Sequence, residues 1–284
     1  MRTITMNGKH ARVFGEIYNS PREIVDIVGA RPHVFDDDDD FFSPGAICNS
    51  PSWNGWTTHE ELIEDCLSCK TRKDIIEGIK AGIKPSIEGV KVRNFANVQG
   101  FAPIVPNALM GLPNSMMDQR RVTVKAKVIN LFVNISTLGG SSAYDLTIAG
   151  TKLMQYVIGL EQSGYRVGLT AFWGTYNDGD VAIIGVKVKD PSQPLDITRC
   201  AYPFVNPSFH RGICYGWYQR TEGFNHDWGY GHVPRHGSSY HRDIQKSLGA
   251  ENGIVIYFQD IINDGEQAIE EAIQMECPEA LRKA

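Results

Sequence analysis

The sequence lacks several features that would place a protein in a class at once. It contains no run of about 18 apolar residues, the length that crosses a bilayer, and residues 1–16 lack the apolar core of a signal peptide. Neither sign of charge dominates, because 28 basic and 33 acidic side chains give a net charge of −5. We therefore expect a soluble, cytoplasmic protein without a membrane partner, and no global electrostatic reason for binding nucleic acid.

The six cysteines lack the spacing of a disulfide framework, and 284 residues suffice to build a core, so we expect reduced thiols. The Cys66-x-x-Cys69 pair lies in a helical pattern without a second ligand pair, which favours two structural thiols over a zinc or redox site. A nucleophile elbow and carboxylates paired at a defined spacing are also missing. These absences favour a protein that is not an enzyme.

The character of the chain changes near residue 120. Residues 1–120 hold short helical patterns, with Ser20-Pro21 starting one helix and Thr57 or Thr58 capping another. We expect this helical and irregular region to pack on an α/β domain at 121–284 that carries a loop-rich excursion at 200–245. The aspartate run 36–40 could chelate a hard cation, but a solvated loop is favoured because five consecutive carboxylates cannot all point inward.

From residue 122 the pattern becomes regular. Residues 122–136 predict a strand, and 143–163 predict a helix with a wide apolar stripe that ends at Gly164. Residues 165–173 and 181–189 predict a hairpin, since the segment between them is rich in Asn, Asp and Gly. Residues 253–259 predict a last strand, followed by a helix at 264–275. The predicted class is α/β, with a Rossmann-like central sheet flanked by helices.

This order of elements resembles the von Willebrand factor A domain over residues 122–276. In that family the first strand ends in Asp-x-Ser-x-Ser and the fourth in Thr-Asp-Gly, and these loops hold a divalent cation that engages a partner's carboxylate. Asn134 stands at the leading Asp, Ser136 matches the first Ser, and Asp260 matches the Asp of the second motif. Since Leu138 replaces the second Ser and Asn134 removes a carboxylate, a Mg or Zn ion at Ser136 and Asp260 remains an alternative, and no cofactor is firmly implied.

The loop after the first strand has a simpler role as well. Ser141 or Ser142 can accept hydrogen bonds from the free amides of the following helix, with Asp145 favourable in its first turn. The same helix N-terminus could receive an anion. Capping is favoured, and the two roles are compatible.

Five motifs are spread along almost the whole chain, at 52–61, 100–116, 164–167, 207–211 and 229–231. Together they resemble a family of uncharacterised tailed-bacteriophage proteins. That resemblance implies a viral origin and a place in the host cytoplasm or the virion. Trp53 and Trp56 flank a turn and are interpreted as a structural plug, with base stacking as the alternative, and residues 103–113 are expected to form an extended strap.

The richest chemistry lies at 206–243, where histidines, arginines and aromatic residues alternate. One interpretation is an exposed, glycine-rich loop that contacts a protein or nucleic acid, and plain structure is another. A third is a zinc or iron site, because imidazole and carboxylate suit those metals. The expected contact residues are His210, Arg211, Trp228, Tyr230, His232, Arg235 and His236, and the candidate metal ligands are His226, His232, His236 and His241, with Ser136 and Asp260.

Two classes of function follow. The favoured class is a non-enzymatic interaction protein, either a host-directed anti-defence factor or an assembly component, which binds a host or viral protein through the A-like scaffold and could form a homo-oligomer. The alternatives are a metal-dependent hydrolase or nuclease that uses residues 210–241, and a nucleic-acid-binding accessory protein that uses 206–243.

Overall fold

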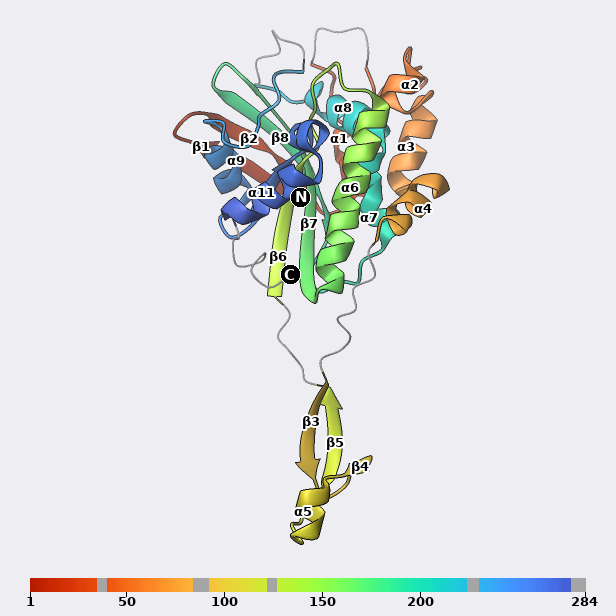
Figure 1. The fold of residues 1–284 in the computed structure, drawn as a ribbon. Helices are drawn as coiled ribbons and strands as arrows, with labels where there is room; N and C mark the ends of the chain where they lie inside the picture. The colour runs from red at the N-terminus through yellow and green to blue at the C-terminus, as the bar shows by residue number, and fades with distance from the viewer. Residues whose placement is uncertain (35–39, 84–91, 122–126, 224–229, 277–284) are drawn as a thin grey trace.

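A mixed six-stranded sheet forms the centre of the molecule (Figure 1). The computed structural model describes residues 1–34, 40–83, 92–121, 127–223 and 230–276. Neighbouring strands follow the order β1-β2-β8-β7-β6-β9, and three of the five pairs are parallel. The strands are β1 (Arg2–Asn7), β2 (Arg12–Tyr18), β6 (Lys127–Asn134), β7 (Tyr165–Asn177), β8 (Asp180–Lys189) and β9 (Ile254–Tyr257). The expected α/β class, with helices flanking the sheet, is confirmed.

Helices cover both faces of this sheet and divide the core in two. The larger core lies under α6 and its neighbours and includes Val167, Ala171 and Trp173 of β7, while the smaller core lies under α9 and includes Phe172. Alternate residues of one strand thus face opposite layers. The helices are α1 (Pro21–Val28), α2 (Pro51–Asn54), α3 (His59–Ser68), α4 (Lys73–Ala81), α6 (Ala143–Gln162), α7 (Ile197–Val205), α8 (Tyr215–Tyr218), α9 (His241–Leu248), α10 (Phe258–Asp264) and α11 (Glu266–Glu276).

The elements predicted from period and turn chemistry are confirmed. Helix α6 begins after Ser142 and ends before Gly164, which takes the left-handed conformation with φ +87°. Strands β7 and β8 form a hairpin whose turn residues, Asp178 and Gly179, both have positive φ. The strand predicted at 253–259 is shorter, because α10 starts directly after β9 and takes Asp260 into its first turn.

The N-terminal region supplies strands as well as the expected helices. β1 and β2 form an antiparallel pair, and β2 lies parallel to β8 in the central sheet. Arg12 and Asp180 are register partners in this pair, and the Arg12 guanidinium donates to both carboxylate oxygens of Asp180 at 3.0 and 2.5 Å. Residues 1–18 are therefore part of the α/β body. The place of β2 in the central sheet was not predicted, because its partner β8 lies more than 160 residues away in the chain.

The segment after α7 is helical, and the expectation of an exposed loop is wrong for residues 207–218. A π-helix, η1 (Phe209–Cys214), runs directly into α8, and every side chain of η1 is buried. The glycines that suggested a loop are close-packing positions: a Cβ at Gly212 would overlap Leu62, and one at Gly216 would overlap Phe42. Residues 224–229, with His226 and Trp228, lie outside the described residues.

A small second unit, which we call the arm, comprises residues 92–121. It contains β3 (Val92–Asn97), β4 (Ala102–Pro103), helix α5 (Val105–Leu109) and β5 (Met116–Arg121), with the sheet order β3-β5-β4. Figure 1 shows it apart from the body. The expected extended strap at 103–113 is wrong, because this segment forms the end of β4 and a short helix within the arm.

Candidate functional site

The side chain of Asn134 fixes the loop at the carboxyl end of β6 to its neighbours. Its Oδ1 accepts hydrogen bonds from the amides of Ser136 and Gly174 at 3.0 Å each, and its Nδ2 donates to the Gly174 carbonyl at 3.3 Å. An aspartate could not donate this last bond. Asn134 thus fixes the end of β6 to β7, which uses the polar atoms that binding would need.

Two hydroxyls in the same loop are buried without a hydrogen-bond partner among the described residues. These are Ser136 Oγ and Thr137 Oγ1. The next residue, Leu138, donates its amide to Gln259 Oε1 at 2.8 Å. The loop is therefore tied to β7 through Asn134 and to α10 through Leu138, and its two hydroxyls have no such contact within the described part of the chain.

Ser142 caps α6 as predicted. Its Oγ accepts from the Asp145 amide at 3.1 Å, and Asp145 Oδ2 accepts from the Ser142 amide at 2.8 Å. Both groups of the capping box are thus satisfied reciprocally. This geometry supports the structural role of Ser142.

Arg211 joins this loop to the N-terminal region. Its guanidinium donates to the carbonyls of Ser141 at 2.6 Å and Trp53 at 2.8 Å, and lies 3.7 Å from the centre of the Trp53 ring. Burial lowers the pKa of Arg211 to about 10. The side chain is fully buried, so it links two segments and does not present the exposed contact that the sequence suggested.

His210 is also buried. Both ring nitrogens lack a hydrogen-bond partner among the described residues, and burial holds the pKa of the imidazole well below its ordinary value. A neutral ring packed against Tyr215, with centroids 5.4 Å apart, is a core group. It is not placed where a partner could reach it.

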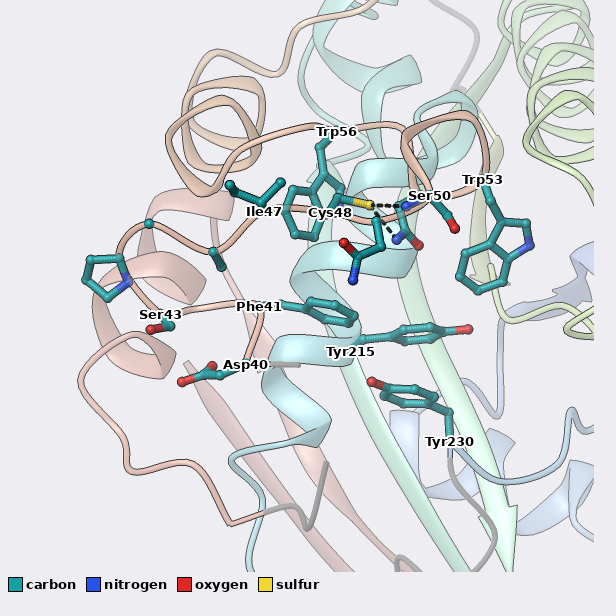
Figure 2. Close-up of a pocket in the computed structure, with 15 residues that line it drawn as sticks. Asp40, Phe41, Ser43, Ile47, Cys48, Ser50, Trp53, Trp56, Tyr215 and Tyr230 are labelled. Carbon is teal, nitrogen blue, oxygen red and sulfur yellow. Dashed lines mark hydrogen bonds between the residues drawn. The ribbon is translucent and has the colours of Figure 1, made fainter. Parts of the chain in front are cut away.

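An aromatic recess lies between the N-terminal region and α8 (Figure 2). Tyr215 and Tyr230 stack with ring centroids 3.9 Å apart, and Phe41 and Trp56 meet edge to face at 5.6 Å. Gln219 supports both sides, since its Oε1 accepts from the Phe41 amide and its Nε2 donates to the Tyr230 hydroxyl. The recess encloses about 490 Å³, which is within the range of small-ligand pockets.

The floor of the recess is polar. Cys48 Sγ accepts from the Ser50 amide at 3.4 Å and from Asn54 Nδ2 at 2.7 Å. Asp40, at the rim, pairs with Arg220 at 2.5 Å. The buried Trp56 acts as the predicted plug, whereas Trp53 is half-buried beneath Arg211. The recess therefore combines aromatic rings with polar groups.

The second candidate site is a cluster of two histidines and a glutamate. His236 Nε2 and His241 Nε2 both lie against Oε1 of Glu276, at 3.3 and 2.9 Å. Of the histidines proposed as metal ligands, the structure brings together His236 and His241. Glu276 was missed, because 35 residues separate it from His241 and no local motif marks it.

The other described residues that were proposed as contacts or ligands are not members of this cluster. His232 exchanges backbone hydrogen bonds with Tyr176, at 2.9 and 3.0 Å, and forms an isolated antiparallel bridge to β7 beyond the end of β6. Asp260 accepts from the His236 amide at 3.1 Å, and burial raises the pKa of its carboxyl. Arg235 is exposed. Cys66 is buried in α3 and Cys69 ends that helix, which agrees with the structural interpretation of this pair.

Comparison with known families gives one result. A family model, described as a domain of unknown function (DUF7192), matches residues 5–283. The chain belongs to the DUF7192 family. The match runs from β1 through the arm to the C-terminal segment. No curated protein and no solved structure matches this DUF7192 chain, and no described helix is long and apolar enough to cross a membrane.

Proposed function

We propose that this chain is a phage-encoded, non-enzymatic interaction protein that binds a host or viral protein through its arm. The observation that carries this proposal is the apolar surface of the arm. Leu109 is 83% exposed, and Phe101 and Val98 are each 63% exposed. The other large apolar side chains exposed there are Phe95, Val105, Met110 and Leu112.

The energetics of so small a unit support a partner. No side chain between residues 94 and 118 is buried, and two or three strands without a core are marginal in water. Covering apolar surface gains about 25 cal/mol per Å². A partner that covers the arm would therefore stabilise its fold and gain affinity from the same contacts.

The order of elements in the body supports the finer assignment to an A-like scaffold. β6, α6, β7, an antiparallel β8, a long excursion, β9 and a helix follow in the order of the von Willebrand factor A domain. The side chain of Asn134 is used in hydrogen bonds within the protein, which does not favour a cation-dependent contact at the end of β6. The arm is the better binding surface, while the nucleic-acid alternative loses His210 and Arg211, which are buried.

The test uses full-length protein in which Phe101 and Leu109 are both changed to Ser. Capture from a lysate of the bacterial host should recover a specific partner with the wild type and lose it by about 10-fold or more with the arm variant, because exposed anchors dominate such contacts. Tyr144→Ser is the matched control, since Tyr144 is 72% exposed on α6 of the body.

Equal capture by the arm variant and the wild type would overturn the proposal. Sedimentation of the purified protein at several concentrations tests whether the arm binds a second copy of the chain. If the wild type self-associates and the arm variant is a monomer, the partner is a second copy of the chain.

A further inference from the structure

We propose that His236, His241 and Glu276 form a binding site for a divalent transition metal, with Zn²⁺ as the expected ion. The site is independent of the arm and lies on the body. Two segments supply it: the stretch from the loop before α9 to the first residue of α9 carries both histidines, and the last residue of α11 is the glutamate. The fold thus brings a carboxylate from a distant part of the chain to a pair of histidines that are close in sequence.

The spacing of the ligand atoms fits a tetrahedral ion. Zinc binds imidazole nitrogen and carboxylate oxygen at about 2.0–2.1 Å, which places neighbouring ligand atoms of a tetrahedron about 3.3 Å apart. The two Nε2 atoms lie 3.3 and 2.9 Å from Glu276 Oε1, and all three ligand atoms lie within 4.8 Å of one another. Small side-chain adjustments would admit the ion.

Outer contacts hold the ligands in place. The second oxygen of Glu276 accepts from the Val255 amide at 2.7 Å, and Nδ1 of His241 lies 3.0 Å from the Tyr257 hydroxyl. The backbone of His236 is fixed by Asp260. Such contacts orient metal ligands, and they favour binding through Nε2 of His241.

The site opens to solvent on one side. A surface depression that includes the three ligands is also lined by His10, Ser238, Ser239, Arg242, Gln245 and Met275. The side chains of His236, His241 and Glu276 are 24%, 10% and 10% exposed. Three protein ligands with an open fourth position are typical of sites that keep a water or exchangeable ligand on zinc.

The same three groups could instead form only a hydrogen-bonded cluster, in which both imidazoles donate to the carboxylate. Glu276→Gln distinguishes the metal site from the hydrogen-bonded cluster. An amide keeps an acceptor oxygen for the imidazoles but loses the charge that a hard or borderline cation needs. His241→Ala removes a ligand outright. Tyr257→Phe removes the outer contact to His241 and keeps the packing of the ring.

The experiment measures zinc binding to tag-free, chelator-treated full-length protein by calorimetry and by metal analysis after dialysis. We expect one Zn²⁺ per chain, loss of more than about 100-fold in affinity in His241→Ala and Glu276→Gln, and about 10-fold or more in Tyr257→Phe. His59→Ala, at the start of α3, should bind as the wild type does.

Zinc should also raise the unfolding temperature of the wild type and leave that of Glu276→Gln unchanged. Less than one ion per chain at micromolar zinc, or equal binding by the wild type and Glu276→Gln, would overturn the site. Stoichiometric binding of Fe²⁺ or Mn²⁺ without zinc would overturn the assignment of the ion.

Discussion

Glu16 shows how one polar side chain joins three parts of the body. Its carboxylate accepts two hydrogen bonds from Arg31, at 2.7 and 2.9 Å, and one each from Tyr18 and Trp217. Burial would raise the pKa of Glu16, but these hydrogen bonds outweigh it and hold the pKa below its ordinary value. β2, the end of α1 and α8 therefore meet at a charged group that is satisfied on all sides.

We expect Glu16→Gln to lower the free energy of unfolding at pH 7 by about 1–3 kcal/mol, because the Arg31 guanidinium loses its charged partner. Since the folded pKa is depressed, this contribution is present above the unfolded value of about 4.3 and is lost as the pH falls through the folded pKa. The difference between variant and wild type should thus shrink below about pH 4.

Urea unfolding between pH 3 and 7 measures this difference. Glu270→Gln, a change at an exposed carboxylate of α11, is the control and should alter stability by less than about 0.5 kcal/mol at any of these pH values. A constant difference between Glu16→Gln and the wild type across the range would contradict the expectation.

At the scale of the element, η1 and α8 depend on glycine for their approach to the N-terminal helices. Gly212 lies against Leu62 and Trp56, both of which are buried. Gly150 has the same role in α6, where a Cβ would overlap the Phe204 carbonyl of α7. These glycines bring helix backbones within contact distance, as a residue without Cβ allows.

Gly212→Ala should destabilise the protein by about 1–3 kcal/mol, because its Cβ has no room beside Leu62. Gly159→Ala is the matched control: it lies in α6 with nothing within 4 Å of its Cβ, so it should stabilise by about 0.5–1 kcal/mol. Combining Leu62→Ala with Gly212→Ala tests the contact. The destabilisation of the double variant should be smaller than the sum of the destabilisations of the two single variants. Thermal unfolding of Gly212→Ala, Leu62→Ala, the double variant and Gly159→Ala gives the four values needed, and strict additivity would contradict the contact.

The elements that the sequence predicted are those whose signals are local. α6 carries its own cap and apolar stripe, and the β7–β8 hairpin carries its own turn. β2 enters the central sheet through a distant partner strand, β8, and the glycines of η1 and α8 indicate a loop until Leu62 and Phe42 are known to face them. The cluster at His236 was half predicted, because its two histidines are close in sequence and Glu276 is not.

At the scale of the whole molecule, the body and the arm differ in how they are stabilised. The body holds two hydrophobic cores, one on each face of its sheet. The described side chains of the arm are all at least partly exposed. Stability should therefore reside in the body and partner binding in the arm.

Replacing residues 92–121 with a flexible Gly-Ser linker should change the free energy of unfolding of the body by less than about 1 kcal/mol, since loop length alone has a small cost. Urea unfolding followed by tryptophan fluorescence measures this, because the tryptophans at 53, 56, 173, 217 and 228 all lie outside the arm. A loss of several kcal/mol would show that the arm contributes to the core.

The position of β8 between β2 and β7 also bears on synthesis. β2 ends at residue 18 and its parallel neighbour begins at residue 180, so at about 5–20 residues per second the ribosome needs roughly 8–30 s to supply the partner. During that interval the nascent β1–β2 hairpin has an open edge. We therefore expect chaperones that shield such edges to act on the ribosome-bound chain. The β2–β8 pairing can form only after β8 has emerged.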